Sequence, residues 1–455
     1  MKRRILATCL SVSTGAAFVL GGCGTGNGNQ SGNVQGKRIT INFMTWASGQ
    51  ELTSLQTAFS NFEKLHPNIT VKADVVQNAN YETKLSTLVA AGSAPDIAYM
   101  DYPQLYGEKG QLTDLTQDIE NMKGINYTKS GNGFLPGLIF KDKGHDWGVS
   151  IGPEIQMLFY NKTLFQQAGI QPPSADPAHP WTWDQLLAAA KKLTVDENGK
   201  HPGEPGFQPL KIKTYGIEVN SGAWEFLSQS NGGGVVSRDG KHLLINQPAS
   251  IQAVQAQADL ALSDHVAPPP TATSTMPSGP TMLENGQLAM LLDGQYDVGT
   301  FYQDKYTPGY AAVPMFKTPK DVVWSAGISI FKSSKYQKED WELLSFLLNP
   351  KNILNMYETG VWIPPLTSWY TDPKYTKLWA DNPIHGGNYM QVVKGTVTNP
   401  KIAESPYYIW AKNNQEITNT LDQVLGSVWT GKTTAQKALT HAAPQLQSLL
   451  QGAYQ

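Results

Sequence analysis

Residues 39–100 alternate between the spacing of a β-strand and the spacing of an α-helix. Apolar residues occupy every second position in 39–43 and 69–75, which is the period of a strand. They recur three or four positions apart in 52–65 and 81–89, which is the period of a helix face. A third strand is predicted over 95–100. This order predicts an α/β fold with a parallel sheet, which binds ligands at the carboxyl ends of its strands.

Length and charge narrow the function classes. The chain has 455 residues, which at about 100–200 residues per domain predicts two or three domains. Charged residues make up 16% of the chain and the formal net charge is -2. A chain without a large positive field has no means of collecting phosphate backbones, so no nucleic-acid partner is expected.

The N-terminus has the pattern of an export signal. Lys2, Arg3 and Arg4 precede a mostly apolar run that ends at Leu20-Gly21-Gly22-Cys23. This predicts a signal peptide over 1–22, too short to span a membrane permanently. The tetrapeptide resembles the lipobox of bacterial lipoproteins, which implies that Cys23 is lipidated and becomes the first mature residue. An ordinary signal peptide cut elsewhere is the alternative. Residues 23–36, rich in Gly, Asn, Gln and Ser, predict a flexible tether.

Two further patterns bear on cofactors. Residues 426–433 match the phosphate-loop pattern G-x-x-x-x-G-K-T, but that site needs a preceding strand, and 417–428 has helical spacing. The eight His residues form no pair four positions apart. We therefore expect neither a nucleotide nor a metal, and no cofactor.

Six stretches together point to a family. They are 90–97, 158–170, 181–194, 285–294, 326–330 and 341–350, among them Ala-Gly-Ser-Ala-Pro-Asp-Ile and Phe-Tyr-Asn-Lys-Thr-Leu-Phe. In their order and spacing they resemble the extracellular solute-binding proteins of ABC importers, in particular the carbohydrate-binding branch that is similar to maltose-binding proteins. The lipoprotein start matches how Gram-positive bacteria hold such receptors at the outer face of the cell membrane.

The resemblance implies a two-lobed periplasmic-binding-protein-like (type II) fold with a hinge and a central ligand cleft. Lobe 1 is expected at 37–152 and 310–357, and lobe 2 at 153–309 and 358–455. The hinge strands are expected near 152–155 and 307–312. The implied partners are a carbohydrate, the ABC permease subunits and, through the lipid on Cys23, the membrane. The receptor is expected to be a monomer and not an enzyme.

A sugar receptor needs aromatic rings to cover the C–H faces of the ligand and fixed polar groups to meet its hydroxyls. Each residue that the resemblance places in the cleft also has an ordinary explanation: a Trp can be core packing, Asp101 a helix cap, and Glu154 an exposed hinge residue. The resemblance implies these ligand-binding residues: Trp46, Ser48, Asp101 and Tyr102 from lobe 1, Glu154 at the crossing, Trp224, Asp293, Tyr296 and Trp410 from lobe 2, and Trp324 or Trp362 at one end.

The charges of this set predict the class of sugar. Asp101, Glu154 and Asp293 are acidic, and no Lys or Arg accompanies them at those strand ends. Ionised carboxylates accept hydrogen bonds from hydroxyls and repel anions, so a neutral oligosaccharide is expected. Two alternatives remain: a secreted lipoprotein glycoside hydrolase or lyase, because a sugar cleft with two carboxyls also describes an enzyme, and the same fold binding a non-sugar solute.

Overall fold

The computed structural model describes residues 38–122, 133–270, 275–405 and 407–454. The predicted signal peptide (1–22), the lipidation site Cys23 and the tether (23–36) lie outside the described residues. Those three predictions stay predictions.

The first sheet is built on the alternating segment. Strands β1 (Ile39–Thr45), β2 (Ile69–Val75) and β3 (Ile97–Met100) form its parallel part, with β1 paired to both neighbours. Helices α1 (Gly49–Leu65) and α2 (Asn78–Ala90) are the crossovers between them. The order of strands and helices predicted from residue spacing is confirmed, and most of each apolar face is buried; Leu65 and Val75, at the ends of α1 and β2, are exposed.

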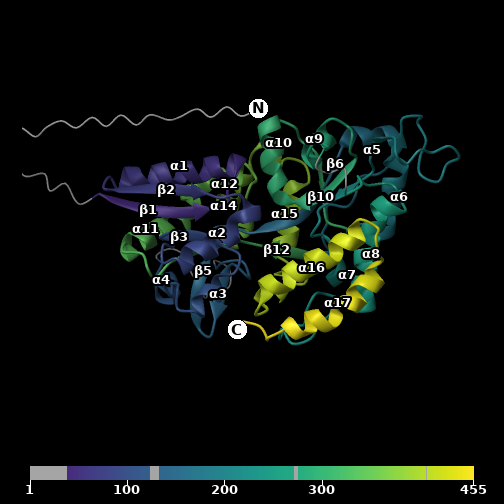
Figure 1. Cartoon of the computed structure of the whole chain (residues 1–455). Helices are drawn as coiled ribbons and strands as arrows, with labels where there is room; N and C mark the ends of the chain where they lie inside the picture. The colour runs from purple at the N-terminus through teal and green to yellow at the C-terminus, as the bar shows by residue number, and fades with distance from the viewer. Residues whose placement is uncertain (1–37, 123–132, 271–274, 406, 455) are drawn as a thin grey trace, which may run out of the picture. The chain divides into compact units, whose positions relative to one another are not determined.

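Three later strands extend this sheet in the antiparallel sense. They are β13 (Gly327–Ile330), β5 (His145–Val149) and β4 (Ile139–Asp142), which complete the strand order β2-β1-β3-β13-β5-β4. The short helices α3 (Pro103–Gly107) and α4 (Thr116–Glu120) lie beside β5 (Figure 1).

The second sheet is organised around β6 (Glu154–Tyr160), a strand with six buried residues. Strands β10 (Met290–Gly294), β11 (Gly309–Ala311) and β12 (Asp321–Trp324) pair antiparallel with it. Two short strands complete the edges, β9 (Glu218–Val219) beside β10 and β14 (Ala403–Glu404) beside β12. A separate two-stranded sheet joins β7 (Val195–Asp196) and β8 (Ile212–Thr214).

Helices next to the second sheet follow the predicted spacing. Helix α5 (Lys162–Ala168) follows β6, and α6 (Trp183–Leu193) opens with the capping box predicted from Thr182 and Gln185. In the box, Gln185 N donates to Thr182 Oγ1 and Thr182 N donates to Gln185 Oε1, which satisfies two backbone groups at the helix start. Three further elements lie near β10: α9 (Gly279–Glu284), the 3-10 turn η1 (Gln295–Asp297) and α10 (Val298–Asp304).

Four helices enclose a separate apolar core at the C-terminal end of the chain. They are α7 (Trp224–Ser230), α8 (Pro248–Leu262), α16 (Asn414–Trp429) and α17 (Ala435–Leu449). The first four residues of the phosphate-loop-like sequence form the last turn of α16, so a helix precedes that sequence, as its spacing predicted.

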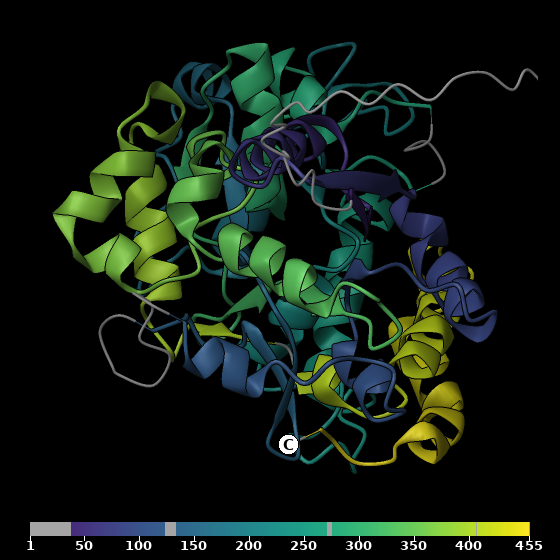
Figure 2. The same ribbon diagram turned by 90° about the vertical axis from the view of Figure 1, so that its left-hand side faces the viewer.

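A second group of helices packs on an apolar core that residues of both sheets share. It comprises α11 (Gln337–Leu347), α12 (Leu354–Glu358), α13 (Ser368–Thr371), α14 (Pro373–Ala380) and α15 (Tyr389–Val397). Their buried aromatic residues share one apolar core with β1 and β3. Figure 2 shows the yellow C-terminal helices apart from the lime-green α13–α15.

These pairings bear on the expected lobes. Strands β11 and β12 belong to the second sheet, although all but the first residue of β11 falls within 310–357. Helix α15, within 358–455, packs on β6 and β11 of the same sheet. The predicted lobe ranges themselves stay a prediction. The second crossing between the sheets, expected near 307–312, lies instead at Ser325–Ala326, between β12 and β13. Backbone pairing with β6 holds β11 in the second sheet.

The first crossing between the sheets overlaps the hinge expected near 152–155, and its role as a hinge stays a prediction. Residues 150–153 join β5 of the first sheet to β6 of the second. The two crossings run side by side, because Glu154 pairs with Trp324 on one side of them and Val149 pairs with Ile328 on the other. Tyr357 reinforces this region by donating a hydrogen bond of 2.6 Å to the carbonyl oxygen of Ile151.

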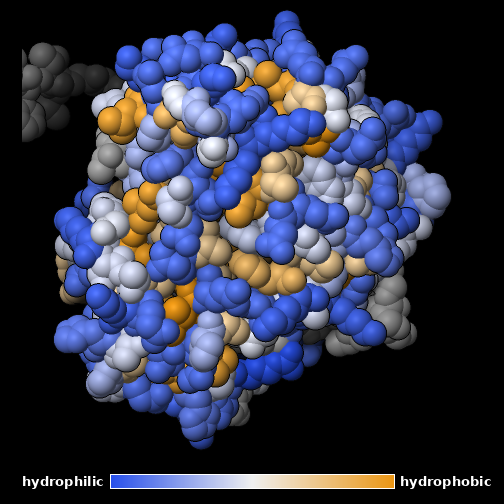
Figure 3. Space-filling view, turned by 90° about the vertical axis from the view of Figure 1, so that its right-hand side faces the viewer, coloured by the Kyte–Doolittle hydropathy of each residue, from blue (hydrophilic) through white to orange (hydrophobic). Residues whose placement is uncertain are grey.

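The surface of the described residues is mostly polar. Figure 3 shows one face, on which hydrophilic residues predominate and hydrophobic ones lie among them. Within the described ranges, the helices are all too short or too polar to cross a membrane.

Candidate functional site

A cavity of about 500 Å³ lies where residues of the two sheets meet. Its walls come from the segment after β1, the end of β3, the two crossings, the η1–α10 segment and the loop after α12. The lining residues are Trp46, Ser48, Gly49, Gln50, Glu51, Asn78, Asp101, Glu154, Tyr296, Asp297, Gly299, Thr300, Gln303, Trp324, Ser325, Ala326, Val361 and Trp362.

Aromatic rings form much of this lining. Trp46 packs edge-on against two buried Tyr residues, with ring centroids 4.8 Å from Tyr81 and 5.2 Å from Tyr99. Trp362 is fixed by its indole nitrogen, which donates a hydrogen bond of 2.9 Å to Glu51 Oε1. Rings held in this way present rigid apolar faces to a ligand at little entropic cost.

Asp293 holds Tyr296 in position. The Tyr296 hydroxyl donates a hydrogen bond of 2.7 Å to Asp293 Oδ1, and Asn220 Nδ2 donates to the same oxygen at 2.6 Å. The ring folds back over Gly294, where an added Cβ would lie 1.9 Å from a ring carbon. Gly294 therefore leaves the space that this orientation of Tyr296 requires.

The polar part of the lining is acidic. Four carboxylates line the cavity, those of Glu51, Asp101, Glu154 and Asp297, and the lining contains no Lys, Arg or His within the described ranges. Burial raises the pKa of Glu154 to about 8, and the negative charges of Glu51, Asp101 and Asp293 add to the shift. Burial also raises the pKa of Glu51 to about 7 and that of Asp101 to about 6. Desolvation disfavours the charged form of each group.

The acidic residues differ in the hydrogen bonds that their carboxyl groups accept. Glu51 accepts from Trp362, and Asp293 accepts from Tyr296, Asn220 and the backbone nitrogen of Gly294. The carboxyl group of Glu154 makes no hydrogen bond to any residue that the structure describes. Its hydrogen-bonding capacity is left for whatever enters the cavity.

The structure brings seven of the predicted ligand-binding residues to this cavity. They are Trp46, Ser48, Asp101, Glu154, Tyr296, Trp324 and Trp362. Asp293 lies behind Tyr296 rather than on the wall.

The other three predicted residues lie outside the lining. Trp224 packs into the C-terminal core with 6% of its surface exposed, because it opens α7 on that helix's buried side. Trp410 stacks on Phe140 with ring centroids 5.8 Å apart. Tyr102 lines a second cavity of about 210 Å³ beside Lys109. The ligand-binding roles of all the predicted residues stay predictions.

Several lining residues were missed from the sequence. Gln50 and Glu51 open α1 just after β1, and Asn78 opens α2 just after β2. The sequence pattern could have predicted these three residues, because helix starts that follow parallel strands lie at the ligand-binding edge of such a sheet. Gln303 had no such signal: its side chain reaches across from α10 and donates to Gln50 Oε1 at 3.3 Å.

No cation site accompanies the cavity. Across the ranges that the structure describes, no group of three or more His, Cys, Asp or Glu side chains has an arrangement that could hold a metal ion.

The chain is similar to several characterised proteins. It is 22% identical over 447 residues to the erythritol/L-threitol-binding protein of Mycolicibacterium smegmatis, covering 89% of each chain. It is 24% identical over 431 residues to the sn-glycerol-3-phosphate-binding periplasmic protein UgpB of Pectobacterium atrosepticum, covering 88% of each.

Solved structures show the fold. The ABC substrate-binding protein Lmo0181 of Listeria monocytogenes, solved in complex with cycloalternan, superposes with a TM-score of 0.75 at 24% identity, over 90% of this chain and 99% of that one. The predicted two-lobed, periplasmic-binding-protein-like α/β fold is therefore confirmed. The sequence model of the bacterial extracellular solute-binding proteins matches residues 46–353. The chain belongs to the bacterial extracellular solute-binding protein family.

Proposed function

We propose that this protein captures a neutral oligosaccharide outside the cell and delivers it to the permease of an ABC importer. The observation that carries the proposal is the cavity of about 500 Å³, whose walls combine the rings of Trp46, Tyr296, Trp324 and Trp362 with acidic groups and no cationic side chain within the described ranges. Rings cover the C–H faces of a sugar and carboxyl groups meet its hydroxyls.

The similar proteins support a carbohydrate or polyol ligand. The relative from Mycolicibacterium smegmatis is an erythritol/L-threitol-binding protein, Lmo0181 was solved in complex with cycloalternan, and a T. maritima protein of the same fold was solved with maltose bound. One relative binds an anion, sn-glycerol-3-phosphate. The lining is acidic and, among the residues that the structure describes, holds no cation, which opposes an anion in this chain, because a phosphate or uronate would face Glu51, Asp101 and Glu154 without a counter-charge.

The geometry supports capture by closure. Lining residues come from both sheets, so a bound sugar contacts both halves and stabilises the state in which they are closest. The two crossings at 150–153 and 325–326 are the segments about which the halves would turn. The receptor itself does no chemistry in this scheme, and the permease takes over the released solute.

We also propose that the protein is held at the outer face of the cell membrane of a Gram-positive bacterium by lipid on Cys23. The support is the signal-like sequence that ends in Leu20-Gly21-Gly22-Cys23. Expression of Cys23→Ala in a Gram-positive host should move the protein from the membrane fraction to the culture medium. Retention of that variant in the membrane fraction would contradict lipid anchoring.

A thermal-shift panel tests the ligand class. Maltose, maltotriose, mannotriose, cycloalternan and erythritol are compared with uronic-acid oligomers of matched length, because a ligand that binds only the folded state raises its Tm. We expect one or more neutral sugars to raise the Tm and the acids to leave it unchanged. A shift with the acids alone would refute the charge argument, and a panel without any shift would favour a non-sugar solute.

An assay for new reducing ends in the same mixtures addresses the enzyme alternative. Binding without product supports the receptor, whereas steady release of reducing ends would identify a glycoside hydrolase.

A further inference from the structure

Glu154 occupies a special place in the cavity. It is the first residue of β6, directly after the crossing at 150–153, and its backbone pairs with Trp324 at the other crossing. Its carboxyl group lines the cavity and makes no hydrogen bond to any described residue. Any hydrogen bonds of this group are therefore made to solvent or to the ligand.

The groups that face Glu154 are all acidic or phenolic. Glu51 approaches from α1, Asp101 follows β3, and Asp293 is the last residue but one of β10. Tyr296 and Asp297 line the same cavity from η1. The cavity lining supplies no Lys, Arg or His in the described part of the chain. A neutral sugar that enters the cavity displaces water from these carboxylates without bringing a compensating positive charge, which penalises their ionised forms.

A neutral carboxylic acid removes this penalty. It has one O–H donor and a carbonyl acceptor, so it can meet a ligand oxygen as well as a ligand hydroxyl. Glu154 is suited to this form, because it lacks the hydrogen bonds by which neighbours favour the charged forms of Glu51 and Asp293. It also lies between the two crossings, in reach of a ligand that contacts both halves.

We propose that Glu154 binds the ligand as a neutral carboxylic acid that donates a hydrogen bond to it, so that capture of a neutral sugar takes up a proton from the solvent. This inference rests on the proposed function. The rise of the Glu154 pKa to about 8 through burial and the neighbouring acids is consistent with it. By linkage, a ligand that binds only the protonated form loses affinity as the pH rises above the pKa of the free protein, by up to tenfold per pH unit.

Calorimetry tests the proton directly. The probe is whichever of maltotriose, mannotriose and cycloalternan raises the Tm most, titrated at pH 8 in phosphate and in Tris, whose heats of ionisation differ. We expect the binding enthalpy to differ between the buffers by an amount that corresponds to uptake of up to one proton, and the affinity to fall at least tenfold between pH 7 and pH 9.

The variant Glu154→Gln tests whether the hydrogen-bond donor, rather than a negative charge, binds the ligand. The amide carries a donor and an acceptor at every pH, so we expect lower proton uptake, a flatter pH profile and tighter binding than the natural protein at pH 9. Glu120→Gln, on the exposed face of α4, is the matched control and should keep the natural pH profile.

Two results would overturn the proposal: binding of the probe without proton uptake, or weaker binding by Glu154→Gln than by the natural protein at pH 9. Either leaves sugar capture standing. If none of the three sugars binds, the proposed function itself fails and this inference fails with it.

Discussion

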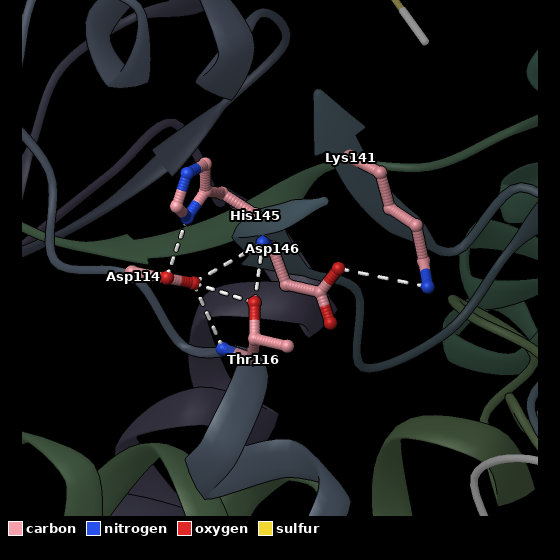
Figure 4. Close-up of polar contacts among 5 residues, drawn as sticks. All are labelled: Asp114, Thr116, Lys141, His145 and Asp146. Carbon is pink, nitrogen blue, oxygen red and sulfur yellow. Dashed lines mark hydrogen bonds and ion pairs between the residues drawn. The ribbon is translucent and has the colours of Figure 1, made fainter. Parts of the chain in front are cut away.

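The molecule contains two groups of acidic residues that differ in their neighbours: hydrogen-bond donors surround the acid in one, and other acids surround the acid in the other. In the first, on the surface beside β5, Asp114 Oδ2 lies 2.6 Å from His145 Nδ1, and Asp114 Oδ1 accepts from the Thr116 hydroxyl at 2.6 Å (Figure 4). Lys141 Nζ lies 3.6 Å from Asp146 Oδ1 in the same group. In the second, the cavity, Glu154 meets other acids and makes no hydrogen bond to a described residue.

The difference appears in the pKa values. Partial burial acts to raise the pKa of Asp114, but hydrogen bonds from Thr116, His145 and the Asp146 backbone together outweigh it, and the pKa is lowered. The pKa of Glu154 is raised, because burial and like charges act in the same direction. A carboxylate surrounded by donors holds a loop in place, whereas one surrounded by acids costs stability and keeps its hydrogen bonds for a ligand.

The largest effect on ligand affinity is expected at Tyr296, whose hydroxyl is held by hydrogen bonds. Tyr296→Ala removes the ring that Asp293 and Asn220 hold, and we expect it to weaken sugar affinity at least tenfold, which is about 1.4 kcal/mol. Calorimetry with the best neutral sugar measures the change. Tyr302→Ala, an exposed residue of the neighbouring helix α10, is the control. Equal affinities of the Tyr296 variant and the natural protein would remove this ring from the site.

Glu154→Gln should stabilise the ligand-free protein at high pH. The pKa of Glu154 is about 8 in the folded state and about 4.5 in the unfolded state. Below pH 4.5 the carboxyl is neutral in both states and does not lower the free energy of unfolding. As the pH rises from 4.5 through 8, the unfolded state ionises first, and the free energy of unfolding falls. Glutamine does not titrate and escapes this loss. We expect the variant to gain about 1 kcal/mol at pH 8.5 and much less at pH 5, measured by urea unfolding. A gain of equal size at both pH values would show that charge is not its cause.

Asp114→Asn should lower the free energy of unfolding, whereas Glu154→Gln should raise it. The pKa of Asp114 is lowered in the folded state, so the carboxylate stabilises the protein above its unfolded pKa of about 3.8, and this stability is lost as the pH falls through the folded value. Because the Asp114 side chain is 40% exposed, solvent screens its contacts, and we expect a loss below about 1 kcal/mol at pH 7 that disappears in acid, by the same unfolding measurement. A stabilising Asp114→Asn would erase the contrast between the two groups of acidic residues.

His145→Ala should give the smallest effect. Its ring is half exposed, so its contact with Asp114 is screened by solvent and contributes about 0.5 kcal/mol. Raising the salt concentration should shrink the difference in unfolding free energy between this variant and the natural protein. A salt-independent loss would instead point to the stacking of the ring near Trp147, whose centroid lies 5.1 Å away.

Local patterns predicted the scaffold better than they predicted the cavity. The spacing of apolar residues located β1 to β3 and the helices between them, and Thr182 with Gln185 located the start of α6, because these features depend on neighbours within a few positions. The family resemblance pointed to Trp46, Glu154, Tyr296 and four other residues that the structure places in one cavity.

Long-range packing set the limits of prediction from sequence. A tryptophan has no sequence mark that separates a cavity wall from a core, so Trp224 and Trp410 were placed at the cleft, although they pack elsewhere. Strand pairing with β6 likewise moved the second crossing from 307–312 to 325–326. The place of Trp410 and the place of the second crossing both depend on partners more than 80 positions away along the chain.

The two neighbouring crossings have a mechanical consequence. In the proposed closure, Glu154 and Trp324 lie next to the pivot, each on a strand that adjoins one crossing, and the two residues pair with each other. A ligand held there acts close to the axis, where a small displacement changes the angle between the halves most. The same rotation is magnified at the outer rims of both halves, so that a membrane partner could sense occupancy from surfaces far from the sugar without touching it.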